Sequence, residues 1–102
     1  MTEQTPMTPL EARRAEVAQY EQNIAMYTAI LETLPTEWPE HLVDYRSVAD
    51  QHKAVAQVED MADVELLSDL WYADQCKAAI RAETVEKNKA KRILAVMEAQ
   101  QG

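Results

Sequence analysis

Glycine is almost absent from this sequence: the single glycine, Gly102, is the last residue. Tight β-hairpins place glycine at the positive-φ positions of their turns. Phosphate-binding loops, dinucleotide-binding turns and nucleophile elbows also need glycine for close backbone approach or a sharp turn. The shortage of glycine therefore excludes these hairpins, loops, turns and elbows in their usual form. Phenylalanine is missing as well, whereas alanine is abundant, and this composition favours helices over strands.

Cysteine and long apolar runs are also scarce. Cys76 is the only cysteine, so no intramolecular disulfide can form, which fits a reducing compartment. No apolar run approaches the ~20 residues that a membrane span needs. The polar start "MTEQTPMTPL" lacks the apolar core of a signal peptide. We therefore expect a cytoplasmic protein with no membrane partner.

Basic residues are few: 10 Lys and Arg stand against 18 Asp and Glu, for a net charge of −8. This balance disfavours nucleic acid as a partner of the whole protein. It suits a partner with a basic surface, or it serves only solubility. The charge is uneven, because residues 1–76 hold four basic and fifteen acidic residues, whereas residues 77–102 hold six and three.

The clearest pattern is a seven-residue period in the first third of the chain. Leu10, Val17, Ile24 and Leu31 form one series, and Arg13, Tyr20, Tyr27 and Leu34 follow three positions behind. This a/d arrangement is typical of a coiled-coil seam, here with one polar position. The facing helix belongs either to the same chain or to a second copy. The predicted partner or self-association seam is Leu10, Val17, Tyr20, Ile24, Tyr27, Leu31 and Leu34.

Helix signals divide the rest of the chain. Thr8 and Pro9 are typical of a capped helix start, and Pro35 must end that helix. We expect a flexible arm at 1–7 and one helical domain at 8–102, with helices at about 9–34, 39–57 and 61–99. The break before the third helix has only Asp60 or Asp63 as a cap, so a continuous second and third helix stays open. The predicted class is all-α: a helical hairpin or three-helix bundle, forming a homodimer or higher oligomer through the seam or the third helix.

The stretch "LPTEWPEHLVDYR", residues 34–46, has two interpretations. Two prolines and acidic residues beside Pro39 predict a rigid corner between helices, with Trp38 lying over the end of the helix pair. Alternatively, Trp38 is a hot spot for a partner, because tryptophan is enriched in such sites. Trp71, in the most apolar part of the third helix, is a second candidate hot spot.

No constellation of catalytic residues, cofactor ligands or metal ligands stands out. Glu37, His41 and Asp44 could share a helical face, but the paired Glu-x-x-His motif of bundle metal sites is missing. His52 falls on the apolar stripe of the second helix, as a core-edge histidine or a pH-sensitive contact. Cys76 has no histidine near it in sequence. We predict no enzyme activity, no cofactor and no metal.

A basic band covers part of the third helix. Its members are Lys77, Arg81, Lys87, Lys89, Lys91 and Arg92. The band could contact phosphates, but it lacks interleaved aromatic residues for base stacking. A solvated face, or attraction to an acidic face of the same or a neighbouring chain, is the simpler interpretation.

Three functional hypotheses follow. The first is a non-catalytic, acidic interaction module that docks on a larger protein complex as an inhibitor or adaptor. Phage-encoded anti-defence and host-takeover factors include many small acidic helical proteins, so this role is suggested by analogy, with mimicry of nucleic-acid charge as one form of it. The second is a structural or assembly protein, such as a scaffolding or particle component. The third is a nucleic-acid-associated protein that uses the basic band at 77–92.

Overall fold

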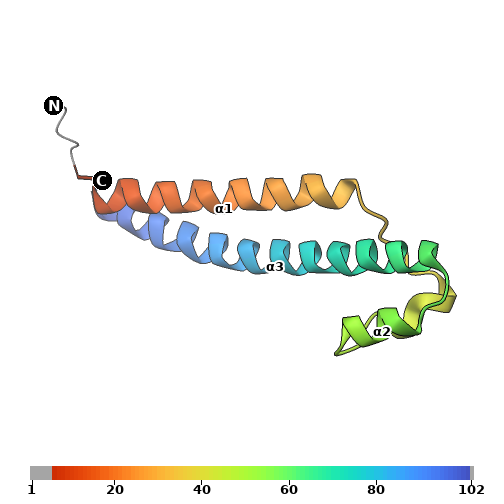
Figure 1. Cartoon of the computed structure of the whole chain (residues 1–102). Helices are drawn as coiled ribbons and strands as arrows, with labels where there is room; N and C mark the ends of the chain where they lie inside the picture. Colours follow the sequence, from red (N-terminus) through yellow and green to blue (C-terminus); the bar gives the residue numbers. More distant parts are fainter. Residues whose placement is uncertain (1–5, 102) are drawn as a thin grey trace. The chain divides into compact units, whose positions relative to one another are not determined.

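The chain is helical over most of its length. The structure, a computed structural model, describes residues 6–101. In order it contains α1 (Pro9–Glu32), the 3-10 helix η1 (Glu40–Tyr45), α2 (Gln51–Gln57) and α3 (Met61–Gln101), as Figure 1 shows. Helices hold 81% of the described residues, and none of these residues lies in a strand. The predicted all-α class is confirmed; the bundle, the heptad pairing and the oligomer stay predictions.

Two compact units make up the fold. Unit 1 comprises Met1–Tyr27 and Ala79–Gly102, and unit 2 comprises Thr28–Ala78. Helices α1 and α3 contribute to both units, whereas η1 and α2 lie in unit 2. Most of the arm predicted at 1–7 lies outside the described residues. The assignment of 8–102 to a single domain stays a prediction.

Local capping sets the limits of α1. The Glu11 amide donates to the Thr8 hydroxyl at 3.1 Å, which satisfies one of the free amides of the first turn. At the other end, the amides of Thr33 and Leu34 bond to carbonyls three residues back, so the last turn tightens before Pro35. The helix ends at Glu32, two residues before the predicted limit.

The single helix predicted at about 39–57 is wrong. Pro39 is extended, with ψ 148°, and precedes only the short η1. A second helix, α2, then begins after Asp50, whose carboxylate accepts a hydrogen bond from the Lys53 amide at 3.1 Å. In an uninterrupted helix, the Lys53 amide would bond to a backbone carbonyl of the preceding turn. Here the Asp50 carboxylate accepts this bond, so the N-cap favours the start of a new helix. The apolar stripe predicted along 39–57 therefore does not exist as one helical face, and His52 is exposed.

The start of α3 is as predicted. Val58–Asp60 separates α2 from α3. The Asp60 carboxylate accepts a hydrogen bond from the Ala62 amide at 2.9 Å, and its carbonyl accepts one from Val64 at 3.1 Å. Asp60 is therefore the cap, and α2 and α3 are separate helices. The third helix extends to Gln101, two residues beyond the predicted limit.

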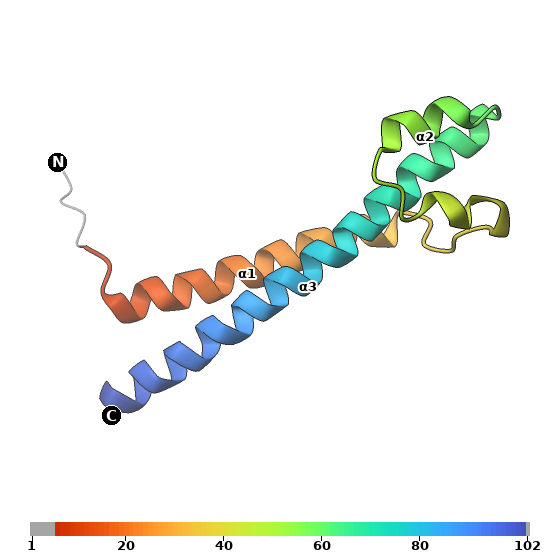
Figure 2. The same cartoon turned by 90° about the horizontal axis from the view of Figure 1, so that it is seen from below.

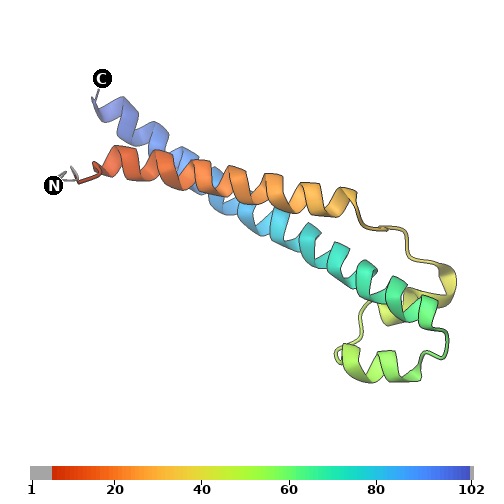
Figure 3. The same cartoon turned by 45° about the horizontal axis from the view of Figure 1, so that its top comes forward.

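In unit 1 the beginning of α1 lies beside the end of α3, and the two helices run in opposite directions (Figures 2 and 3). Arg14 pairs with Glu98 at 3.2 Å, and the Asn23 amide group donates to Glu83 at 3.4 Å. As the residue number increases along α1, the number of the contacting residue on α3 thus decreases, as in any antiparallel pair. Val17 is only 7% exposed, which places it within the contact between the helices.

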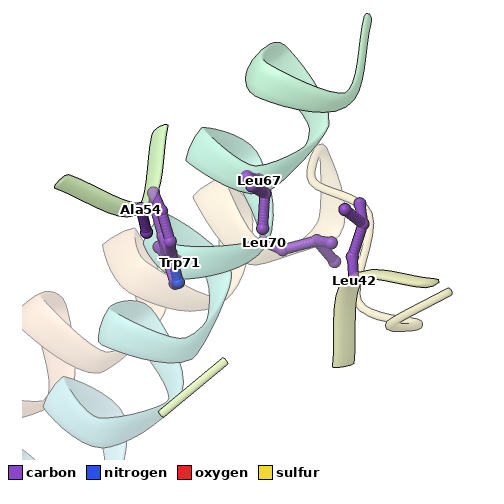
Figure 4. Packing of buried hydrophobic residues seen from close by; sticks show 5 residues of the cluster. All are labelled: Leu42, Ala54, Leu67, Leu70 and Trp71. Carbon is purple, nitrogen blue, oxygen red and sulfur yellow. The ribbon is translucent and has the colours of Figure 1, made fainter. Parts of the chain in front are cut away.

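Unit 2 has the denser apolar core. Its buried members, shown in Figure 4, are Leu42, Ala54, Leu67, Leu70 and Trp71. They come from η1, α2 and α3, so this core joins α3 to two elements of six and seven residues that are too short to be stable alone. Burying a leucine side chain contributes about 1.5–3 kcal/mol. This core therefore positions the corner that precedes α2.

Candidate functional site

Trp38 lies between the end of α1 and the start of η1. Its ring is half-buried and packs against the core of unit 2. The Arg46 guanidinium lies 5.5 Å from the ring centroid, a distance at which the cation is attracted to the ring face. The indole N–H is buried and has no hydrogen-bond partner within residues 6–101. Trp38 thus combines a structural contact with a buried donor that has no partner among the described residues.

Trp71 is more deeply enclosed than Trp38. Only 6% of it is exposed, and its indole N–H donates to the Tyr45 carbonyl at 3.0 Å. This bond ties α3 to the last residue of η1. Part of the Trp71 surface still lines a groove between α2 and α3. The role of Trp71 as a partner hot spot stays a prediction. In that role, a partner would contact Trp71 through this groove.

The groove beside Trp71 has a volume of about 330 Å³. It is lined by Gln51, His52, Val55, Ser68, Trp71, Tyr72 and Gln75. Hydrogen-bonding side chains alternate here with aromatic and aliphatic ones, and Tyr72 is 46% exposed. Cofactors are held in enclosed pockets. The shape and lining of this groove are better suited to a contact with a protein side chain.

Arg46 neutralises one acidic residue of α3. Its guanidinium makes two hydrogen bonds to the Asp74 carboxylate, at 2.9 and 3.0 Å. This forked geometry is the strongest form of side-chain ion pair, although both groups remain partly exposed. Arg46 is thus held by Asp74 and by the Trp38 ring, while its side chain stays 48% exposed. Sequence reasoning missed this pair, since no local pattern connects residues 28 positions apart.

We call residues Trp38–Arg46 the acidic corner. Val43, at its centre, is 48% exposed, and the flanking side chains of Glu40 and Asp44 are exposed as well. The corner therefore presents an apolar side chain between two carboxylates. The predicted stretch 34–46 contained these residues, and in η1 Val43 lies at the surface while its neighbour Leu42 is 2% exposed.

The histidine and acids considered as metal ligands are not brought together as a helical face. Glu37 precedes η1 outside any helix. The imidazole Nε2 of His41 instead contacts the Asp63 carboxylate of α3 at 3.1 Å, and the His41 side chain is 62% exposed. Within residues 6–101, no three His, Cys, Asp or Glu side chains are grouped so that they could hold a metal ion. Cys76 is 1% exposed in α3.

The predicted seam occupies the less exposed side of α1. Leu10 and Val17 are buried, and the other five members are half-buried. Arg13, the polar position of the pattern, pairs with Glu16 at 3.0 Å. In unit 1 this side is covered by the chain itself at Leu10 and Val17. Contact of the seam with a second copy stays a prediction.

Tyr20 lies on this seam in a strongly acidic environment. Partial burial, then the negative charges of Glu16, Glu86 and Glu83, raise the pKa of its phenol above the ordinary value of 10.0. The folded chain therefore favours the neutral phenol. Any stability that Tyr20 contributes in this way is present below pH 10 and is lost as the pH rises through the raised pKa.

This shift predicts a late-titrating tyrosine. Subtracting the alkaline titration of Tyr20→Phe from that of the wild type, both at 295 nm, is expected to leave a transition with its midpoint above about 10. In denaturant the same difference is expected to return to about 10. A difference transition at or below 10 in the folded protein would contradict the assignment.

The basic band is divided between two environments. Lys77 and Lys87 are half-buried, while Arg81, Lys89, Lys91 and Arg92 are exposed. Lys89 pairs with Glu86 at 3.4 Å. The exposed members therefore cover only part of the predicted band.

Comparison with protein-family models, with curated proteins and with solved structures finds no match for this chain. Within residues 6–101, no helix combines the length and the apolar character that crossing a bilayer requires. A function for this chain therefore rests on its own residues and their arrangement.

Proposed function

We propose that this chain is a non-catalytic interaction module, whose unit 2 docks on the basic surface of a larger protein. The distribution of charge carries the proposal. Unit 2 holds eleven acidic and three basic residues, a net of −8, whereas the rest of the chain holds seven of each. The entire net charge of the protein is thus concentrated in half of its residues.

The acidic corner is the part of unit 2 best suited to the contact. Val43 offers an exposed apolar side chain, and Glu40 and Asp44 form a charged rim around it. Protein interfaces combine an apolar centre with a polar rim, and opposite charges on the two partners increase the rate and specificity of association. The ion pair with Asp74 offsets the charge of the one arginine of the corner, so the acidic side chains dominate there.

In this proposal the module acts as an inhibitor or adaptor, as phage-encoded anti-defence and host-takeover proteins do. Where the larger partner is a nucleic-acid enzyme, the carboxylates of unit 2 take the place of phosphates on its basic surface. Charge attraction of this kind weakens as salt rises, which separates it from a purely apolar contact.

The test uses two double variants with the same change of charge. Glu40→Lys with Asp44→Lys alters the corner, and Glu11→Lys with Glu21→Lys alters exposed acids of α1 in unit 1. Tagged proteins are used to recover partners from a nuclease-treated lysate, and the affinity of a recovered partner is then measured by calorimetry. We expect the corner variant to weaken binding at least about tenfold, and the control to leave it within about twofold of wild type.

Two results would oppose the proposal. Equal binding by the wild type and the corner variant would exclude the corner as the docking site. A partner that is recovered only when nuclease is omitted would indicate the nucleic-acid role and the basic band in place of this function.

A further inference from the structure

The second half of α3 carries a row of exposed residues that the fold does not use. Val85, Lys89, Arg92 and Val96 are all exposed, and they follow one another at spacings of four, three and four. Such spacings place side chains on one face of a helix. The two valines are 52% and 58% exposed, which is high for aliphatic side chains. We call these four residues the basic stripe; it lies within unit 1.

The first half of α3 carries a row of opposite charge. Met61, Glu65, Asp69 and Tyr72 are exposed at spacings of four, four and three, so they also share one face. Met61 is 69% exposed and Tyr72 46%. We call these residues the acidic stripe; it lies within unit 2. Each stripe thus has two charges of one sign between two apolar residues, and the apolar ends are 11 residues apart in both.

We propose that the basic stripe of one copy packs antiparallel on the acidic stripe of a second copy. In this register Val96 faces Met61, Arg92 faces Glu65, Lys89 faces Asp69 and Val85 faces Tyr72. Every charge then meets its opposite, and every exposed apolar residue meets another apolar residue. The contact does not depend on the proposed function or on the acidic corner.

Charge selects this pairing over the alternatives. A basic stripe against a second basic stripe would bring like charges together, and the same holds for two acidic stripes. Within residues 6–101, Glu65, Asp69 and Arg92 have no ion-pair partner. Lys89 has only the exposed pair with Glu86 at 3.4 Å, and such pairs contribute little, so it can exchange for Asp69 of a second copy.

The seam of α1 is less suited to this contact with a second copy than the stripes of α3 are. Leu10 and Val17 are already buried within the chain. The stripes, in contrast, leave four large apolar side chains exposed. Covering them is favourable in proportion to the apolar area removed from water. The contact joins two different faces, so it is heterologous, and it either closes a ring or continues along a row of copies.

The experiment reverses each stripe separately and then mixes the products. One variant is Lys89→Glu with Arg92→Glu, and the other is Glu65→Lys with Asp69→Lys. Sedimentation velocity over a concentration series measures association of the full chain. We expect the wild type to associate, and each variant alone to have a dissociation constant raised at least about tenfold. An equimolar mixture is expected to associate again, because each stripe then meets one of opposite charge.

Matched controls separate this contact from general charge effects. Arg81→Glu with Lys91→Glu changes the same net charge on exposed positions of α3 outside the stripe. Glu40→Lys with Asp44→Lys does so for the acidic stripe. Both controls are expected to associate as the wild type does. Circular dichroism at 222 nm checks that every variant stays helical, which substitutions at exposed positions should permit.

A crosslink gives the register independently. Mixing Glu65→Cys with Arg92→Cys under oxidising conditions is expected to give a disulfide-linked pair, whereas Glu65→Cys with Lys91→Cys is not, because Lys91 is off the stripe. The proposal is overturned if the wild type is monomeric throughout the series, if the mixture of charge-reversed variants fails to associate, or if both cysteine mixtures crosslink equally. If the charge-reversed variants lose binding to a different protein but self-associate as the wild type does, the stripes serve that protein and the proposed self-association is wrong.

Discussion

Replacing Leu70 with alanine is expected to lower the free energy of unfolding by about 3 kcal/mol. Leu70 is fully enclosed, with 0% exposure, in a core that joins η1, α2 and α3. The alanine side chain leaves a cavity among neighbours that belong to three different elements, so no single element can shift to fill it. Alanine and leucine have similar helix propensities, so the loss reports packing and not the stability of α3 itself.

Urea unfolding followed by fluorescence measures this effect, because both tryptophans, Trp38 and Trp71, lie in unit 2. Leu94→Ala is the matched control: it makes the same substitution on the same helix, at a half-buried position in unit 1. We expect the control to lose less than half as much. If Leu70→Ala and Leu94→Ala lower the free energy of unfolding equally, the core of unit 2 is not the main source of the stability of that unit.

Replacing Trp38 with alanine is expected to cost about 2 kcal/mol. The ring packs against the core of unit 2 and lies under the Arg46 guanidinium, and alanine removes both contacts. The cost is lower than for a fully buried tryptophan, because Trp38 is only half-buried. No hydrogen bond is lost, since the indole N–H has no partner within the described residues.

Trp38→Phe separates packing from polarity. Phenylalanine keeps an aromatic ring under Arg46 and removes a buried donor that has no acceptor, so we expect stability within about 0.5 kcal/mol of wild type. Thermal unfolding of both variants decides between the corner and the hot spot. If Trp38→Ala melts as the wild type does while partner binding is lost, the ring serves a partner and not the fold.

Three limits of two helices, the two ends of α1 and the start of α3, could be predicted from the sequence because each depends on neighbouring residues. Thr8 and Asp60 bond amides two or three positions ahead, and Pro35 restricts the residue before it. The same local chemistry at Asp50 was overlooked in favour of a long apolar stripe, and the single helix at 39–57 was wrong for that reason. Its signal, an aspartate three residues before the bonded amide of Lys53, was present.

The candidate site could be predicted only in part. The prolines, acidic residues and Trp38 of the stretch 34–46 predict a corner or a binding site. Its internal contacts were not predictable, because Arg46 reaches Asp74 and Trp71 reaches Tyr45 across 28 and 26 positions.

The sequence by itself determined the all-α class, the start of α1 and the concentration of negative charge, and it favoured a break before α3. These properties follow from composition and from hydrogen bonds between residues a few positions apart. The tertiary structure alone decided that Arg46 pairs with Asp74, that the Trp71 indole N–H donates to the Tyr45 carbonyl, and that α3 leaves two oppositely charged stripes exposed. A helix has several faces of comparable polarity, and only packing against distant parts of the chain selects which of them is buried.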